Sequence, residues 1–187
     1  YHPRDNADAT YVTAGTHATE RLLTKGGGDV EKVRLAFLFL LAYPGAPAIY
    51  YGDEIGLTGG KDPECRRAFP WATSRWNYTI RDWVKRLIAL RKQLVVLRRG
   101  DFRRICLNVS EACYAFARLT AEQQVVVALN ASPIPRQFRI PVEMISWSDG
   151  MTVYDVIQPG VQYQVEQGCF NIALPAWGGA WISNKAV

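Results

Sequence analysis

The chain has 187 residues, of which 49% are hydrophobic, and 22 basic against 17 acidic side chains give a net charge of +5. This apolar content suffices for a folded core and excludes disorder throughout. The basic residues are scattered apart from three Arg-Arg pairs, whereas nucleic-acid binding needs a basic stripe, so no nucleic-acid partner is expected. No apolar run approaches the roughly 20 residues that cross a bilayer, so no membrane association is expected either.

The four cysteines are Cys65, Cys106, Cys113 and Cys169, and their spacing matches neither a zinc site nor a disulfide framework. We therefore expect free thiols and a reducing, cytoplasmic compartment. With only two histidines in the chain, a zinc site is not expected. No oxygen-rich loop demands calcium, and nothing calls for an organic cofactor.

The first half of the chain alternates between strand and helix patterns. A weak strand is predicted over residues 10–13. Asp29 is a favourable N-cap for a helix over residues 30–43, whose apolar side chains cover nearly its whole circumference and must be buried. Pro44 ends this helix, and a short buried strand is predicted over residues 48–51. This order is typical of an α/β domain with a parallel sheet.

A long loop over residues 56–77 comes next, and long loops in compact domains are often functional. Thr79 is the predicted N-cap of the following amphipathic helix, with Asp82 completing a capping box. Apolar residues at steps of three and four continue the helix to Leu97, and Gly100 is the expected C-cap.

After residue 98 the chain becomes rich in short strands separated by turn residues, a pattern typical of a β-sandwich or barrel. We therefore expect two domains, residues 1–98 and residues 99–187. The predicted strands cover residues 103–107, 113–119, 125–130, 137–140, 152–156, 163–165, 170–174 and 180–183.

Three segments of the first domain carry a distinctive set of motifs: residues 15–21 (GTHATER), residues 44–56 (PGAPAIYYGDEIG) and residues 62–71 (DPECRRAFPW). In this order they resemble the α-amylase superfamily (glycoside hydrolase family 13), and the third points to the branch of neopullulanases, cyclomaltodextrinases and maltogenic amylases. The resemblance implies an α/β plus all-β fold, namely the C-terminal portion of a (β/α)₈ TIM barrel followed by an antiparallel β-sandwich (domain C). A complete barrel takes about 250 residues, so most of one is expected to be missing here.

Retaining glycoside hydrolysis uses two carboxyl groups about 5 Å apart. The resemblance places the nucleophile and the general acid on earlier barrel strands, and it aligns a third, transition-state-stabilising Asp with Ala18. It therefore implies that this chain holds no catalytic residue. Asp53 and Glu54 follow a predicted strand, but adjacent strand residues point to opposite sides, so structural hydrogen bonding is the preferred interpretation.

Three residues match substrate-binding positions of the family. His17 corresponds to a histidine that hydrogen-bonds the sugar in the central subsite, with a purely structural histidine as the alternative. Asp62 and Arg66 correspond to a pair that holds a more distant glucose unit, with a surface salt bridge that pins the loop as the alternative. Arg21 is expected to pair with a carboxylate, and Trp71 to be a buried loop anchor rather than a sugar-stacking platform.

The resemblance thus implies a glycosidase of carbohydrate metabolism in part only: a C-terminal fragment or truncated relative of an enzyme acting on maltodextrin, cyclodextrin or pullulan, inactive as this chain alone. The alternative is a non-catalytic carbohydrate-binding or assembly module derived from the same fold. The expected ligand is an α-glucan oligosaccharide. Because two strands cut from a closed barrel have unpaired edges, we also expect a homo-oligomer or the missing barrel segments to cover residues 30–56 and the apolar side of the second helix, and self-association is the preferred interpretation.

Overall fold

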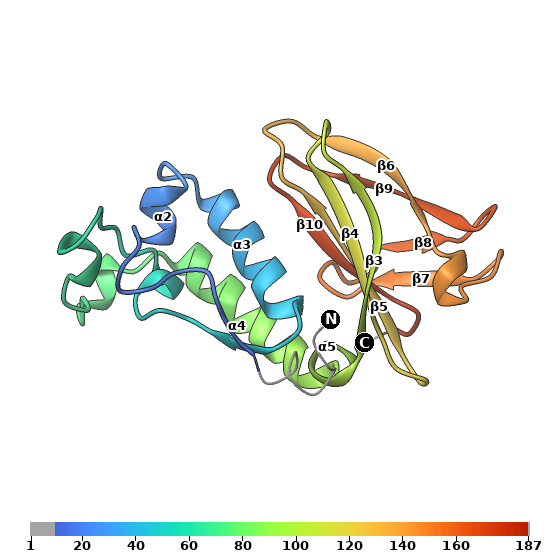
Figure 1. Ribbon diagram of the computed structural model, residues 1–187, viewed down its shortest axis with the longest axis horizontal. Helices are drawn as coiled ribbons and strands as arrows, with labels where there is room; N and C mark the ends of the chain where they lie inside the picture. Colours follow the sequence, from blue (N-terminus) through green and yellow to red (C-terminus); the bar gives the residue numbers. More distant parts are fainter. Residues whose placement is uncertain (1–9, 187) are drawn as a thin grey trace. The chain divides into compact units, whose positions relative to one another are not determined.

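The computed structural model describes residues 10–186. The chain divides into two compact units between Gln93 and Leu94 (Figure 1). The boundary that we expected after residue 98 falls within α5 (Val96–Arg99), a short helix of the second unit. Within the described residues, no helix is long and apolar enough to cross a membrane.

The first unit is built around two short parallel strands, β1 (Tyr11–Thr13) and β2 (Ala46–Ala48). They are joined through α2 (Leu22–Lys25) and α3 (Val30–Ala42), so the parallel crossover expected from the sequence is present. The strand predicted over residues 48–51 is β2, and it lies earlier in the chain, over Ala46–Ala48. It ends at Ala48 because β1 has only three residues and its last residue, Thr13, pairs with Ala48.

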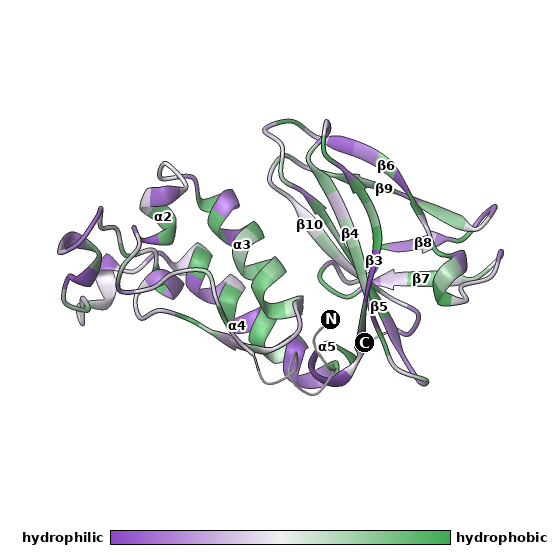
Figure 2. Ribbon diagram, viewed as in Figure 1, coloured by the Kyte–Doolittle hydropathy of each residue, from purple (hydrophilic) through white to green (hydrophobic). Residues whose placement is uncertain are grey.

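Helix α3 begins as its sequence predicts. The Asp29 side chain accepts a hydrogen bond from the backbone N–H of Glu31 at 2.9 Å, which confirms the predicted N-cap. Tyr43 has extended geometry before Pro44, which ends the helix one residue earlier than expected. Figure 2 shows hydrophobic colour along most of α3, and its buried residues are Val33, Phe37, Leu38, Leu40, Leu41 and Ala42.

Helix α4 (Tyr78–Gln93) packs beside α3 but starts differently from the prediction. The side chain of Asn77, not that of Thr79, accepts from the N–H of Ile80 at 3.1 Å. The prediction of one continuous helix as far as Leu97 is also wrong, because the helix is interrupted between the end of α4 at Gln93 and the start of α5 at Val96. The apolar spacing in the sequence continues across this interruption. Gly100 is the C-cap of α5, as expected.

Arg91 ties the end of α3 to α4. Its guanidinium is buried and donates to the carbonyl of Leu41 at 2.7 Å and to that of Gly45 at 2.8 Å. The Leu41 carbonyl is one of the last four of α3, which the helix itself leaves without a partner, and the Gly45 carbonyl lies just before β2.

The second unit is an antiparallel sandwich, and each of the eight strands predicted from the sequence is found within two residues of its predicted bounds. One sheet has the order β3-β4-β5-β10-β7-β8, and the other pairs β6 with β9. The strands are β3 (Asp101–Asn108), β4 (Cys113–Leu119), β5 (Gln124–Asn130), β6 (Arg136–Pro141), β7 (Thr152–Asp155), β8 (Gln162–Gln164), β9 (Cys169–Leu174) and β10 (Gly179–Ser183).

Both sheets of the sandwich contribute to one apolar core, which includes Val126, Ile140, Phe170, Ile172 and Ile182. A buried arginine closes the start of this unit: Arg118 donates to the carbonyls of Leu97 and Gly100, each at 2.8 Å. All four cysteines are free, as the sequence predicts.

Candidate functional site

The candidate site begins at the carboxyl ends of β1 and β2, the end of a barrel sheet where active sites form. After β1, a turn closes when the N–H of Thr19 donates to the carbonyl of Thr16 at 3.3 Å. This turn leaves the side chains of His17 and Ala18 exposed. A methyl group therefore stands where the resemblance expects a carboxylate.

Asp62 and Arg66 form a two-point ion pair at the short helix η2 (Glu64–Arg66). Arg66 Nε donates to Asp62 Oδ1 at 2.9 Å, and Arg66 Nη2 donates to Asp62 Oδ2. Both side chains are about half exposed, at 51%. The hydrogen bond from Arg66 holds the pKa of Asp62 below its usual value, and the charges of Arg66 and His17 add to this effect. The carboxylate therefore stays ionised with oxygen lone pairs still open to solvent.

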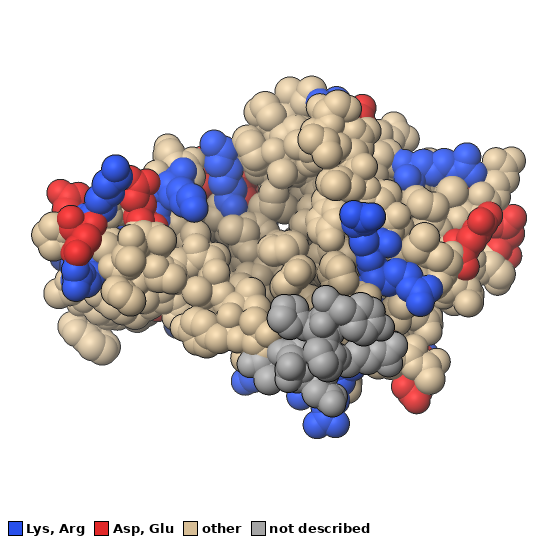
Figure 3. Space-filling model, viewed as in Figure 1, with Lys and Arg blue, Asp and Glu red and all other residues tan. Residues whose placement is uncertain are grey.

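The structure brings the three predicted sugar-binding residues together. Cys65 lies between Asp62 and Arg66 in the sequence, and its side chain is buried. Its thiol donates a hydrogen bond to the backbone carbonyl of His17 at 3.1 Å. The side chains of His17, Asp62 and Arg66 are all exposed. Figure 3 shows acidic and basic side chains intermixed where this loop reaches the surface, and a second pair there joins Arg67 to Glu64 at 3.5 Å.

Asp53 follows the strand, as the sequence predicts, and lies in a single 3₁₀ turn, η1 (Asp53–Ile55). The turn starts after Gly52, whose φ of 88° ends the extended geometry that would have put neighbouring side chains on opposite sides. Asp53 is 2% exposed and lies 3.7 Å from Arg21, so Arg21 pairs with a carboxylate as predicted.

The Arg21–Asp53 pair is structural. The Arg21 guanidinium lies over the rings of Tyr50 and Tyr51, at 4.2 and 4.4 Å from their centroids, and donates to the carbonyl of Tyr51. Burial raises the pKa of Asp53 to about 6, and the charge of Arg21 offsets only part of that rise. A carboxyl group closed off in this way does not reach a sugar, so the preference for a structural role of Asp53 stands.

Trp71 is not the buried loop anchor that the sequence suggested, because its side chain is 82% exposed. The loop is held instead by Trp76, whose Nε1 donates to the carbonyl of Pro70 at 2.7 Å. Phe69 lies between the two tryptophans, with ring centroids 4.9 Å from Trp71 and 5.9 Å from Trp76. The sequence shows three aromatic residues in this loop but not which of them turns inward.

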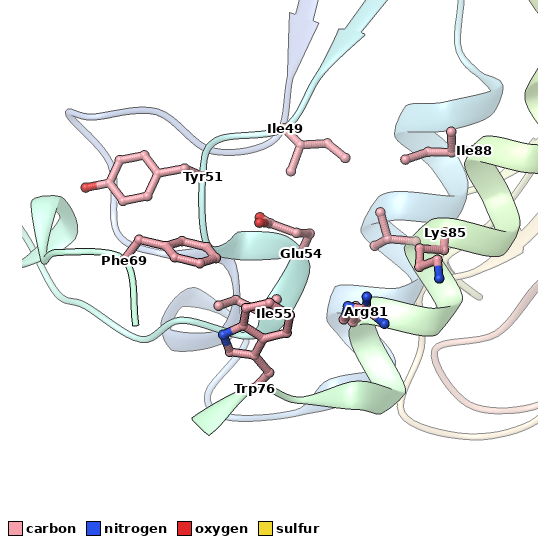
Figure 4. A pocket seen from close by; sticks show the side chains of 10 residues that line it. Ile49, Tyr51, Glu54, Ile55, Phe69, Trp76, Arg81, Lys85 and Ile88 are labelled. Carbon is pink, nitrogen blue, oxygen red and sulfur yellow. The ribbon is translucent and has the colours of Figure 1, made fainter. Parts of the chain in front are cut away.

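A groove of about 540 Å³ lies in the first unit between the segment that follows β2 and helix α4 (Figure 4). No local pattern in the chain predicts this groove, because its walls come from four separate segments. Its lining residues are Ile49, Tyr51, Glu54, Ile55, Phe69, Trp76, Arg81, Val84, Lys85 and Ile88. Among the described residues, no group of three or more His, Cys, Asp or Glu side chains could hold a metal ion.

Two family models match this chain. The α-amylase catalytic-domain model matches residues 3–85, and the model of the neopullulanase-like C-terminal domain matches residues 105–176. The first therefore covers nearly all of the first unit, and the second most of the sandwich.

Similar proteins give the same result. The chain is 42% identical to neopullulanase 2 of Thermoactinomyces vulgaris over 98% of this chain and 31% of that protein. It is 37% identical to a cyclomaltodextrinase of Geobacillus thermopakistaniensis over 95% of this chain and 29% of that protein. Among solved structures, the debranching enzyme of Nostoc punctiforme superposes with a TM-score of 0.79 at 31% identity, covering 96% of this chain and 36% of that one.

The fold and these matches define the family: the chain belongs to the α-amylase superfamily and corresponds to the C-terminal region of its enzymes. Within the superfamily, it is similar to the neopullulanases, cyclomaltodextrinases and maltogenic amylases. The chain spans 29 to 31% of the length of the first two of these relatives.

Proposed function

We propose that this chain is the C-terminal, sugar-binding part of a glycoside hydrolase acting on maltodextrin, cyclodextrin or pullulan, and that it does not cleave glycosidic bonds alone. The observation that carries the sugar-binding part is the exposed Asp62–Arg66 pair beside His17. A carboxylate accepts hydrogen bonds from sugar hydroxyls, and a guanidinium donates them, so a fixed pair suits two neighbouring hydroxyls.

The lack of cleavage rests on the carboxylates of the first unit. Retaining hydrolysis needs two carboxyl groups facing one glycosidic bond. Asp53 is buried against Arg21, Asp62 is bound by Arg66, and the turn after β1 presents the methyl group of Ala18. None of these supplies a free nucleophile beside a general acid.

Ala18 also favours a second candidate, a non-catalytic carbohydrate-binding or assembly module. Even with the rest of a barrel in place, this turn would bring no third carboxylate to the cleavage point. The two candidates differ in one test, a fusion that supplies the nucleophile and general acid from a relative. Hydrolysis of maltotriose with Ala18 in place would assign the chain to an enzyme, whereas hydrolysis that appears only after Ala18→Asp would assign it to a module. The free thiols fit the reducing, cytoplasmic compartment that we propose for either.

Titration with maltotriose, followed through backbone amide NMR signals, tests the sugar site. We expect shifts in residues 15–19 and 59–71 and an affinity in the millimolar range, about 4 kcal/mol. Arg66→Gln should weaken binding about tenfold, because it removes the charged donor of the pair. Arg67→Gln is the matched control, since it breaks the neighbouring ion pair to Glu64 and should bind as the parent does.

Two results would speak against this assignment. Shifts confined to the sandwich, with residues 59–71 silent, would place the sugar elsewhere. Equal affinities of Arg66→Gln and the parent, together with a less stable loop, would support the alternative that the pair only pins the loop.

A further inference from the structure

Exposed aromatic side chains gather in and around the loop that leads into α4. Trp71 is 82% exposed, Tyr78 is 48% exposed and Tyr51 is 39% exposed. Two partly buried rings join them: the centroid of Phe69 lies 4.9 Å from that of Trp71 and 5.9 Å from that of Trp76, which in turn lies 6.4 Å from Tyr78. A single exposed aromatic residue is ordinary, whereas a connected group marks a binding surface.

The backbone on both sides of Trp71 is fixed by hydrogen bonds. The preceding residue, Pro70, is buried, and its carbonyl accepts from Trp76 Nε1 at 2.7 Å. The short helix η3 (Thr73–Arg75) follows, and the N–H of Trp76 donates to the carbonyl of Thr73 at 3.1 Å. The loop therefore holds the Trp71 ring in the solvent, and a ring that is already held in place loses little conformational freedom when it binds a ligand.

This aromatic surface is continuous with the proposed sugar site. The hydroxyl of Tyr51 donates to the carbonyl of Arg67, the residue directly after Arg66, at 2.9 Å. Figure 4 shows the rings of Tyr51 and Phe69 on the same side of the groove, and Phe69 contacts Trp71. Trp71 follows Arg66 by only five residues, which limits the distance between their Cα atoms to about 18 Å. One oligosaccharide of several glucose units can therefore span both.

We propose that Trp71 is a stacking platform for a glucose unit of the same α-glucan chain that Asp62 and Arg66 bind. The proposal rests on the sugar-binding function proposed above. A glucose ring carries C–H groups on its faces and hydroxyl groups around its rim, so an indole ring can cover one face while the hydroxyls stay hydrogen-bonded. The exposed side chains of Thr73 and Ser74, beside the platform, are available as partners at that rim.

Titration of the full chain with maltotriose and with maltoheptaose tests the platform. We expect maltoheptaose to bind about tenfold more tightly, because only the longer sugar reaches Trp71 from the ion pair. Trp71→Ala should remove this gain and leave the affinity for maltotriose unchanged, whereas Trp71→Phe keeps a ring and should retain most of it. Tyr11→Ala is the matched control, since Tyr11 is 70% exposed but lies at the other end of β1 from the sugar site.

The indole N–H signals in the NMR spectrum give a second readout. The chain has six tryptophans, and the signal that is absent from Trp71→Phe belongs to Trp71. This signal should shift with maltoheptaose well beyond its shift with maltotriose. The signal of Trp76 should move less, because its N–H is bound to the carbonyl of Pro70.

The outcomes separate the platform from the sugar site. If Trp71→Ala binds maltoheptaose as the parent does, the platform is overturned, and the sugar site stands as long as Arg66→Gln still weakens both sugars. If the Trp71 signal responds to maltoheptaose while Arg66→Gln binds as the parent does, the two do not hold one chain and the proposal fails. A Trp71 signal that shifts with protein concentration alone would assign the surface to a second copy instead. Binding of neither sugar would refute both proposals.

Discussion

Replacing Asp53 with asparagine should change how the stability of the first unit depends on pH. The carboxyl group is buried beside Arg21, and burial raises its pKa from 3.8 to about 6 in the folded chain. Between these two values the folded state holds a proton that the unfolded state has released. The free energy of unfolding therefore falls as pH rises through this window.

The size of the effect follows from the shift. One pKa unit corresponds to about 1.36 kcal/mol, so titration of Asp53 should lower the stability of the first unit by roughly 2 to 3 kcal/mol between about pH 3.5 and pH 7. Asparagine does not titrate, and the Asp53→Asn variant lacks this contribution. The stability of the parent minus that of the variant should therefore decline by this amount across the window.

Hydrogen exchange in urea, read on peptides of α3, measures the first unit separately from the sandwich. Asp62→Asn is the control, because the pKa of Asp62 is lowered and its difference from the parent should change with pH in the opposite direction. A parent-minus-variant difference for Asp53→Asn that stays flat, or that rises with pH, would refute the reasoning that burial outweighs Arg21.

The purified chain should release no reducing sugar from maltotriose, cyclodextrin or pullulan. The Ala18→Asp variant should not hydrolyse them either, because the nucleophile and general acid are still missing. Release of reducing sugar by either protein would contradict this prediction. Arg118→Met should destabilise the sandwich by about 3 kcal/mol, since it leaves the carbonyls at the end of α5 without their charged donor. Its effect is measured by urea unfolding against Arg104→Met on the exposed side of β3, which should cost under about 1 kcal/mol. Gly15→Ala should destabilise the first unit by about 1–3 kcal/mol in the α3 exchange assay, because the added methyl would lie 2.3 Å from Asp53 Oδ2, and a variant as stable as the parent would show that the carboxylate moves aside.

The candidate site was predictable from the sequence only as a set of residue types. The motifs around His17 and residues 62–66 identify the family and name the three residues. Their convergence depends on a contact between distant segments, the Cys65 thiol and the carbonyl of His17, which no local pattern reveals. The inward turn of Trp76 and the outward turn of Trp71 were likewise decided by the packing of the loop.

The sequence by itself determined the sandwich strands and the N-cap of α3, because alternation, capping and turn residues act over a few neighbouring positions. Only the tertiary structure decided that β2 ends at Ala48, that Asn77 rather than Thr79 caps α4, and that the leucine-rich helix breaks before α5. It also decided that Glu54 lines the groove between the segment after β2 and helix α4. These features depend on which surfaces meet across the fold, and spacing along the chain does not encode such contacts when they join segments many residues apart.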